Sequence, residues 1–314
     1  MIIVTGAFGF IGSHLVERLV QWGEDVVAVG VAPPQEDNRH VLTKIAGSGK
    51  LEIRYQDVAK IDDMKELFTK YQPSIVYHLA AIASHRLSKQ EPYKYLHNNY
   101  NTVLSVLEAA RTAEPSPKIV FSSSSSVYGD NIPPLKENMQ PHPKGPYALS
   151  KLLGEELCKH YTTEYGLNCI IVRYFNVVGE RCRGNIVFRI FAERILRGEP
   201  LEVGGRRVDG VFRPAMRDFT YVADAVEGTI FAGEKAKGFE IFNIGFGRPV
   251  SVMKVAELML KEFGKSLPVV EKELLPHETL VSYSDNTKAR ERLGWAPKID
   301  IVEMVQRFVK WFKT

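Results

Sequence analysis

A tyrosine and a lysine stand four residues apart in the stretch 147–151, after a run of five serines at residues 122–126. Residues at i and i+4 are neighbours on one helix face, so the ammonium of Lys151 can lower the pKa of the Tyr147 phenol. A free tyrosine has a pKa of about 10, and a nearby cation would let it accept a proton near neutral pH. A serine hydroxyl beside it would orient a substrate oxygen. The trio predicts a general base, and ordinary surface packing is the alternative.

The beginning of the chain has the pattern of a strand, a glycine turn and a helix. Residues 1–5 enter a strand directly, glycines follow at positions 6, 9 and 12, and a helical pattern continues to residue 20. Glycines permit a tight turn and let a pyrophosphate approach the backbone amides and the positive end of the helix dipole. A tight turn without a ligand is the alternative. The context favours a dinucleotide site, although the spacing G-x-x-G-x-x-G differs from the commoner G-x-G-x-x-G.

These groups need a scaffold, and short apolar runs alternate with helical patterns through the first half of the chain. The runs are typical of buried parallel strands at residues 2–5, 25–29, 51–55, 75–78, 118–121 and 168–172. The best helical patterns lie at residues 10–22, 61–71, 93–111 and 146–165. Such alternation predicts an α/β protein with a doubly wound parallel sheet.

The character of the chain changes after Asn176. Helical patterns at residues 186–197, 222–233 and 252–263 alternate with short strands. Residues 204–214 are rich in glycine and arginine and are interpreted as a flexible loop. We therefore expect a smaller α/β C-terminal lobe that binds the substrate.

The composition excludes several classes of protein. A chain of 314 residues can bury a large core, and its net charge of +4 comes without a lysine or arginine tract, which favours a pocket for an anionic ligand over nucleic-acid binding. The three cysteines, Cys158, Cys169 and Cys182, are too few and wrongly spaced for a disulfide framework or a zinc site, so no metal is expected and a reducing compartment is favoured. Without an apolar run of about 18 residues or a signal peptide, we expect no membrane span and a cytoplasmic location.

The glycine spacing and the Tyr147/Lys151 pair together resemble the short-chain dehydrogenase/reductase superfamily, specifically its extended branch of nucleotide-sugar epimerases and dehydratases. Further landmarks of the branch lie at residues 57–58, 78–81, 99, 122–129, 173–176, 217–219, 243–245 and 293–295. The resemblance covers nearly the whole chain. It implies a Rossmann NAD(P)-binding domain at residues 1–176, to which the chain returns near 218–245, and a mainly substrate-binding lobe at 177–314.

For the cofactor, the resemblance implies NAD held by the glycine turn, the strand ends and the catalytic pair. The implied contacts are Gly6, Phe8, Gly9, Phe10, Ile11, Gly12, Asp57, Val58, Leu79, Ala80, Ala81, Asn99, Ser122, Tyr147, Lys151 and Tyr174. Asp57 would bind the adenine, with a turn cap as the alternative, and His78 is interpreted as structural. The branch commonly has an acidic residue after the second strand, where this chain has Gly30 and Val31. Because no arginine follows until Arg39, NAD is favoured and NADP stays open.

For catalysis, the resemblance places the substrate-orienting hydroxyl at Ser124, beside Tyr147 and Lys151. Dehydratases of the branch carry an Asp-Glu pair at the positions that match Ser125 and Ser126, and related decarboxylases keep a glutamate there. Serines cannot relay the proton that eliminates water. What remains is reversible hydride transfer, in which Tyr147 takes the proton of a sugar hydroxyl and hydride returns to the other face of the keto sugar.

For the substrate, the resemblance implies contacts to the sugar and to the diphosphate. They are Ser124, Ser125, Ser126, Tyr147, Asn176, Asn185, Arg217 and Ser282. Arg217 suits a diphosphate because its planar fork donates two parallel hydrogen bonds, and a buried ion pair is the alternative. Ser282 matches a position where a large aromatic residue narrows the pocket of galactose epimerases, which hints at room for an N-acetyl group.

One phosphate contact of the branch is missing. Relatives have an arginine at the position of Leu275, and the arginines of the loop at 204–214 are candidates to replace it: Arg206, Arg207 and Arg213. The resemblance also implies a homodimer formed by the helices at 93–111 and 146–165. Apolar positions such as Val103 could equally belong to the core of a monomer, so the oligomeric state stays open.

The sequence therefore predicts a nucleotide-sugar 4-epimerase with bound NAD. The predicted partner is a UDP-hexose, and the reaction interconverts UDP-glucose and UDP-galactose, with the N-acetylated pair also considered, through a transient 4-keto sugar. The alternatives are a UDP-glucuronate epimerase, a nucleotide-sugar reductase and a non-enzymatic, cofactor-sensing binding protein. The nucleotide base and the sugar cannot be derived from these residues.

Overall fold

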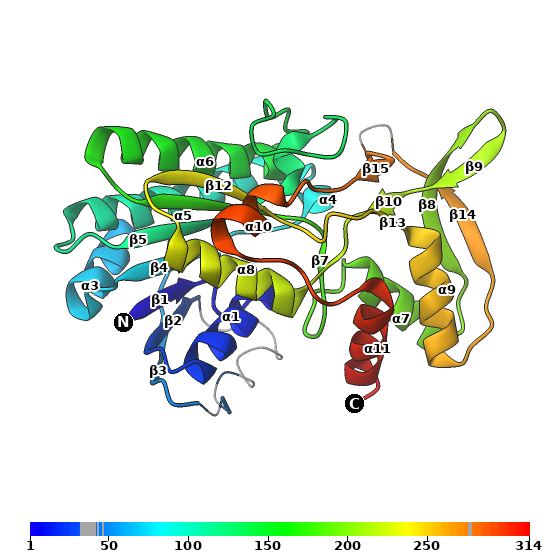
Figure 1. Cartoon of the computed structure of the whole chain (residues 1–314), viewed down its shortest axis with the longest axis horizontal. Coiled ribbons are helices and arrows are strands. Elements are labelled where there is room, and N and C mark those ends of the chain that lie inside the picture. The colour runs from blue at the N-terminus through cyan, green and yellow to red at the C-terminus, as the bar shows by residue number, and fades with distance from the viewer. Residues whose placement is uncertain (32–41, 43, 46, 276–277) are drawn as a thin grey trace.

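The computed structural model describes residues 1–31, 42, 44–45, 47–275 and 278–314. Its centre is a seven-stranded sheet in the order β12-β6-β5-β4-β1-β2-β3 (Figure 1). All neighbouring strands are parallel. The strands are β1 (Ile2–Thr5), β2 (Val26–Gly30), β3 (Leu51–Tyr55), β4 (Ile75–His78), β5 (Lys118–Ser124), β6 (Cys169–Tyr174) and β12 (Phe239–Ile244). The predicted doubly wound α/β fold is confirmed.

Helices cover both faces of this sheet because successive strand residues point to opposite sides. Ile2 and Val4 pack into one apolar cluster and Ile3 into another. The helices of the N-terminal part are α1 (Phe10–Gln21), α3 (Ile61–Tyr71), α4 (His85–Ser88), α5 (Pro92–Thr112) and α6 (Pro146–Tyr165). Figure 1 shows α5 and α6 side by side on one face, with α1 on the other. Among the described helices, none has the length and apolar character needed to cross a membrane.

The serine run is part of the sheet. Strand β5 continues to Ser124, three residues beyond the predicted end, because Ser122, Ser123 and Ser124 pair with Val172, Arg173 and Tyr174 of β6. The chain then turns through a 3-10 helix, η1 (Ser125–Tyr128). The run therefore leaves the sheet at its carboxyl edge, where parallel α/β sheets bind their ligands.

The remaining elements form the C-terminal part of the chain. In order they are β7 (Val177–Val178), α7 (Val187–Arg197), β8 (Leu201–Val208), β9 (Val211–Pro214), β10 (Met216–Arg217), β11 (Thr220–Tyr221), α8 (Val222–Lys235), β13 (Val250–Ser251), α9 (Val252–Phe263), β14 (Val269–Glu273), β15 (Val281–Ser282), α10 (Thr287–Leu293) and α11 (Ile301–Phe312). Strand β12 joins the large sheet beside β6. The domain limits at residues 176 and 177 stay a prediction.

The prediction of a flexible loop at residues 204–214 is wrong. Strands β8 and β9 form an antiparallel hairpin, and β14 pairs with the other edge of β8. Leu201 and Val203 alternate inward and are fully buried. The glycines misled the interpretation: a Cβ at Gly205 would stand 2.4 Å from the carbonyl oxygen of Arg213, so the glycine permits close strand pairing instead of breaking the strand.

A buried carboxylate organises the segments that carry the predicted substrate contacts. Asp218 is fully buried and accepts hydrogen bonds from the backbone amides of Phe246 (2.7 Å) and Gly247 (3.1 Å). It also accepts from the amide (2.9 Å) and hydroxyl (2.6 Å) of Ser284. Because Asp218 directly follows β10 and Ser284 follows β15, these bonds fix the ends of both strands relative to each other.

Gly154 allows helix α6 to approach strand β5. A Cβ at this position would stand 2.5 Å from Cζ of Phe121 and 3.3 Å from Cγ2 of Val103. Both neighbours are buried side chains of the same apolar cluster. The distance between α6 and the serine run is therefore set by a residue without a side chain.

We expect the substitution Gly154→Val to lower the free energy of unfolding by about 1–3 kcal/mol, because an overpacked core forces side chains or backbone to shift. The measurement is chemical denaturation followed by circular dichroism. The matched control is Gly184→Val, since a Cβ there would meet nothing within 4 Å. Equal stability of the two variants would contradict the close docking of α6.

Candidate active site

A cavity of about 950 Å³ opens at the carboxyl edge of the sheet. It is at the upper end of the range of about 300–1,000 Å³ typical of ligand pockets. The glycine turn, the ends of β2, β4 and β5, and the start of α6 line one part of it, and residues from the segment 174–189, β10 and β15 line the rest. Every predicted site residue except Asn99 lies on its wall.

The glycine turn forms a cradle that side chains would fill. A Cβ at Gly6 would stand 2.7 Å from the backbone nitrogen of Ala80, and one at Gly12 would stand 2.2 Å from the carbonyl oxygen of Gly6. Gly6 also has a φ of +66°, which favours glycine. Helix α1 begins after Gly9 and no side chain caps it. Its first amides therefore border the cavity, and this geometry fits a dinucleotide pyrophosphate.

Beyond the glycine turn, the cavity is bordered by the residues at the ends of β2 and β3. Gly30 lies against the ring of Phe8, which a Cβ at Gly30 would approach to 2.7 Å. The Asp57 carboxylate accepts a hydrogen bond from the amide of Ala59 at 3.0 Å, so it caps a turn and also lines the cavity. Its contact with the adenine stays a prediction. Arg39, considered for a 2'-phosphate, lies outside the described residues.

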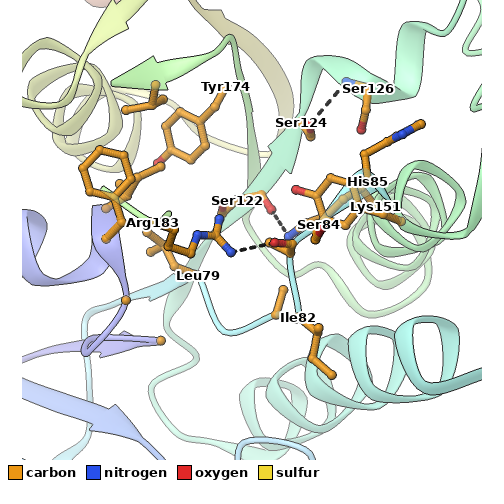
Figure 2. A pocket seen from close by; sticks show the side chains of 18 of the residues that line it. Leu79, Ile82, Ser84, His85, Ser122, Ser124, Ser126, Lys151, Tyr174 and Arg183 are labelled. Atoms are coloured by element: carbon orange, nitrogen blue, oxygen red, sulfur yellow. Dashed lines mark hydrogen bonds between the residues drawn. The ribbon is translucent and has the colours of Figure 1, made fainter. Parts of the chain in front are cut away.

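The predicted catalytic residues converge from α6 and β5. Lys151 is 4% exposed, and its Nζ donates to the carbonyl oxygen of Ser122 at 2.6 Å, a bond drawn in Figure 2. Nζ also lies 5.0 Å from the centre of the Phe121 ring. Tyr147 is one helical turn earlier and is hydrogen bonded with Ser124. The Ser124 hydroxyl accepts from the amide of Ser126 at 3.2 Å. A phenol, an ammonium and a hydroxyl thus line the same cavity.

Burial controls the protonation of this group. Burial, assisted by the positive charge of Arg183 and opposed by Glu155, lowers the pKa of Lys151 to about 7. Burial raises the pKa of Tyr147, whereas Arg183 and the hydrogen bond with Ser124 act in the lowering direction. The sequence predicted that Lys151 would lower the pKa of Tyr147. In the structure the charge that acts to lower the pKa of Tyr147 is that of Arg183, and burial of the phenol outweighs it.

Arg183 is a functional candidate that the sequence analysis missed. Its Nη1 donates to the carbonyl oxygen of Ala83 at 2.6 Å, and Figure 2 shows the side chain reaching across the cavity. Within the described part of the chain, no carboxylate lies within ion-pair distance of it. Arg181, by contrast, pairs with Glu17 at 2.7 Å. The sequence signal that could have identified Arg183 is the presence of two arginines in the short segment between β7 and α7.

His85 and Ser84 also line the cavity and were missed. Nε2 of His85 lies 2.6 Å from the carbonyl oxygen of Lys144, which precedes the start of α6 by two residues. Ser84 caps α4, its hydroxyl accepting from the amide of Leu87 at 3.2 Å. Nothing in the local sequence distinguishes these residues from a loop and a helix cap.

The predicted substrate contacts Asn176, Asn185, Arg217 and Ser282 all line the cavity. Nη1 of Arg217 donates to the carbonyl oxygens of Met216 (2.9 Å) and Leu280 (3.1 Å). Burial lowers its pKa, and the charge of Glu278 acts in the opposite direction. Among the described residues no carboxylate forms an ion pair with Arg217, so the alternative of a buried ion pair is not supported.

The candidates for the missing phosphate contact do not line the cavity. Arg206 donates to the carbonyl oxygen of Glu278 at 2.7 Å and Arg207 pairs with Glu271. Arg213 stands opposite Arg206 in the β8–β9 hairpin. None of the three is among the residues that line the cavity, and Arg206 is the one that contacts the segment around Leu275. The replacement of the missing phosphate contact by one of these arginines stays a prediction.

Asn99 lies behind the wall of the cavity. Its side chain accepts from the amide of Ile82 (2.8 Å) and donates to the carbonyl oxygen of Ile82 (3.0 Å) and to the Ser150 hydroxyl (2.9 Å). It therefore clamps the segment after β4 to helix α6. His78 has a similar structural position, with Nδ1 2.8 Å from the Thr5 hydroxyl. Direct contact of Asn99 with a cofactor stays a prediction.

Comparison with known proteins decides the family. A family model described as the NAD dependent epimerase/dehydratase family matches residues 2–245. The chain belongs to this family. The resemblance stated from the glycine turn and the Tyr/Lys pair is thereby confirmed.

Members with different sugar substrates are similar to this epimerase-family protein. UDP-glucuronate 4-epimerase of Thermodesulfobacterium geofontis is 33% identical over 99% of this chain and 95% of its own. The solved UDP-glucose 4-epimerase of Thermotoga maritima, with UDP-glucose, has a TM-score of 0.87 and 33% identity over 99% of this chain and 98% of that one. The UDP-glucuronic acid 4-epimerase of Bacillus cereus, in complex with UDP-glucuronic acid and NAD, has a TM-score of 0.88 and 30% identity over the same shares.

The buried ammonium gives a test by stability. The pKa of Lys151 is lowered from 10.5 to about 7, so the folded state binds fewer protons than the unfolded state between these values. The cost of burying the charge is complete below pH 7 and disappears as the pH rises towards 10.5. We expect Lys151→Met to be stabilised over the unmodified protein by on the order of a few kcal/mol below pH 7, and by progressively less at higher pH.

The measurement is denaturant unfolding at several pH values from 6 to 10. The control is Lys159→Met, which removes an exposed lysine from the same helix and should leave the pH dependence unchanged. A stability difference between Lys151→Met and the unmodified protein that does not vary with pH would contradict the buried, proton-losing Lys151.

Proposed function

We propose that this protein is an NAD-dependent UDP-sugar 4-epimerase. The observation that carries the proposal is the convergence of Tyr147, Lys151 and Ser124 on the cavity that the glycine turn also lines. A base and a dinucleotide cradle in one cavity suit oxidation of a sugar hydroxyl followed by reduction of the resulting ketone. The similar UDP-sugar epimerases over the whole chain support the same assignment.

The cofactor is NAD, and its site uses residues that are already on the cavity wall. The glycine turn and the first amides of α1 would hold the pyrophosphate. Asp57 and Val58 would bound the adenine end, and Leu79, Ala80 and Ala81 would lie under the nicotinamide. In this proposal residues 1–176, with a return near 218–245, bind NAD and residues 177–314 bind most of the substrate. Bound NAD supplies reversible hydride acceptance.

The chain's own groups would manage the protons and the orientation. Tyr147, once it has lost its own proton, would take the proton of the C4 hydroxyl while the C4 hydrogen leaves as hydride, and Ser124 would hydrogen bond the C4 oxygen. The product is a 4-keto sugar. After the sugar turns, C4 would be reduced on its opposite face and Tyr147 would return the proton to the C4 oxygen. The net reaction inverts C4 and consumes no cofactor.

The residues after Ser124 support epimerisation over elimination. The side chains at positions 125 and 126 are serines that line the cavity, and the Oγ of Ser126 is buried with no hydrogen-bond partner among the described residues. An unpaired buried hydroxyl is costly, so it suits a substrate contact. It supplies no acid for the loss of water.

The first candidate pair is UDP-glucose and UDP-galactose. Arg217 and Asn176 would bind the diphosphate, and Asn185 and Ser282 would border the nucleotide and the sugar. The small side chain of Ser282 leaves the N-acetylated pair as a further substrate. A homodimer and a cytoplasmic location complete the proposal and stay predictions.

A second candidate, UDP-glucuronate, is favoured by Arg183. This cation lies close enough to Tyr147 and Lys151 to influence the pKa of both. Without a carboxylate partner among the described residues, it suits a substrate that brings its own negative charge near the sugar ring. The C6 carboxylate of a uronic acid is such a charge.

The substitution Tyr147→Phe should lower the turnover of a UDP-sugar by on the order of a hundredfold or more, because it removes the general base. Cofactor binding should persist, which calorimetry with NAD measures. Tyr93→Phe, on an exposed tyrosine of α5, is the control. The assay resolves products from a panel of UDP-, dTDP- and GDP-sugars by chromatography.

A stereoisomer formed without net cofactor consumption distinguishes the epimerase from a reductase, which would oxidise or reduce cofactor in step with product. Near-normal turnover by Tyr147→Phe would reject the assignment of the base. Cofactor binding without turnover of any sugar would favour the binding-protein alternative.

The substitution Arg183→Gln should decide between the two sugar pairs. If Arg183 binds a carboxylate, kcat/KM for UDP-glucuronate should fall about 10- to 100-fold, the range for loss of a charged hydrogen bond, while that for UDP-glucose changes little. Arg197→Gln, on an exposed arginine of α7 that pairs with Glu199, is the control. Equal losses for both substrates would assign Arg183 to a part that the two substrates share.

A further inference from the structure

Three residues of α6 form a single row against the serine run. Tyr147, Lys151 and Glu155 are spaced four residues apart, so they lie on one helix face. Each contacts a different serine of β5: Tyr147 contacts Ser124, the ammonium of Lys151 contacts the Ser122 carbonyl, and the carboxylate of Glu155 accepts from the Ser123 hydroxyl. Glu155 therefore lies on the same helix face as Tyr147 and Lys151, one turn beyond Lys151.

Glu155 forms a buried ion pair with Arg173 of β6. Nε of Arg173 donates to Oε1 at 3.0 Å and Nη2 donates to Oε2 at 2.6 Å. The two side chains are 2% and 3% exposed. The guanidinium of Arg173 also lies 4.7 Å from the centre of the Tyr128 ring. The ion pair is thus bidentate, and the guanidinium also contacts an aromatic ring.

Stability alone does not account for this pair. Removing two charges from water costs several kcal/mol per ion, and well-packed apolar residues of similar volume are often as stable as a buried pair. The position of the pair is more informative, because its carboxylate lies one helical turn from Lys151 and its hydrogen bond reaches the serine between Ser122 and Ser124.

We propose that Glu155, fixed by Arg173, is a positioning residue for the reaction, which anchors the row of Tyr147 and Lys151 on the serine run and offsets the charge of the Lys151 ammonium. The inference rests on the proposed function, in which Tyr147 and Lys151 act together on the sugar. Glu155 itself is behind the cavity wall and touches neither substrate nor cofactor.

The charges around Lys151 determine the direction in which its pKa should change when Glu155 is removed. Six titratable or charged groups surround the Tyr147–Lys151 pair. They are Glu155 of α6, His78 of β4, His85 of α4, Tyr95 of α5, Arg173 of β6 and Arg183 of the segment before α7. Burial and Lys151 lower the pKa of His78 to about 3, so that ring is neutral. Glu155 raises the pKa of Lys151, against burial and Arg183. Without Glu155, Lys151 would lose its proton at lower pH.

The test replaces the whole pair, Glu155→Gln with Arg173→Met, so that no unpaired charge remains buried. Glu156→Gln is the matched control, because it removes the same charge from the adjacent, exposed position of α6. A further variant, Glu155→Asp, keeps the carboxylate and covers the case in which the double variant does not fold. Thermal unfolding and calorimetry with NAD establish that each variant is folded and binds cofactor.

Two readouts follow. The alkaline limb of the kcat profile should move to lower pH by about one unit or more in the double variant, and stay in place in Glu155→Asp and Glu156→Gln. The loss of the proton from Lys151 should also move to lower pH in the double variant. It is followed as the pH dependence of the difference in unfolding free energy between each protein and its Lys151→Met counterpart, and needs no substrate.

A folded double variant with an unchanged profile and an unchanged Lys151 titration would overturn the proposal, as would a shift in Glu155→Asp as large as that in the double variant. If the unmodified protein turned over no sugar, the proposed function would fail, and the Lys151 titration would still decide the role of Glu155.

Discussion

The docking of helix α6 on strands β5 and β6 is the constraint on which the active site depends. The ion pair of Glu155 with Arg173 and the bond from Lys151 to the Ser122 carbonyl hold the helix at its inner and middle turns. Gly154 removes the side chain that would keep the helix away. Because Tyr147 is on the same helix face, its distance from the serine run is fixed by contacts one and two turns further along.

The same region determines the charge state of the cavity. A buried lysine and a buried tyrosine each favour their neutral forms in this cavity. Two arginines, Arg183 and Arg217, also line the cavity. An anionic nucleotide sugar would supply the opposite charges and exclude water, which strengthens each electrostatic interaction inside.

The C-terminal part of the chain is tied to the sheet by buried polar bonds as well as by apolar packing. Asp218 joins the ends of β10 and β15 to the segment after β12. The Tyr128 hydroxyl donates to Asn243 at 2.7 Å, and the Asn243 side chain donates to the carbonyl oxygens of Leu135 and Asp285. Such fully paired networks fix one arrangement, because leaving any member unpaired would be costly. They place Arg217 and Ser282 on the cavity wall.

The sequence by itself determined the sheet, the glycine cradle and the Tyr147–Lys151 row, because these depend on periodicity and on spacing within single elements. Tertiary structure alone decided the rest. The hairpin at residues 204–214 forms because β14 supplies a parallel neighbour for β8, which no local pattern reveals. Asn99 is hydrogen bonded to Ile82, and Arg183 lies in the cavity, hydrogen bonded to Ala83. These partners are distant in the chain, so the local sequence does not reveal them. Burial and long-range charges also set the pKa values of Lys151 and Tyr147, and both are properties of the packed molecule.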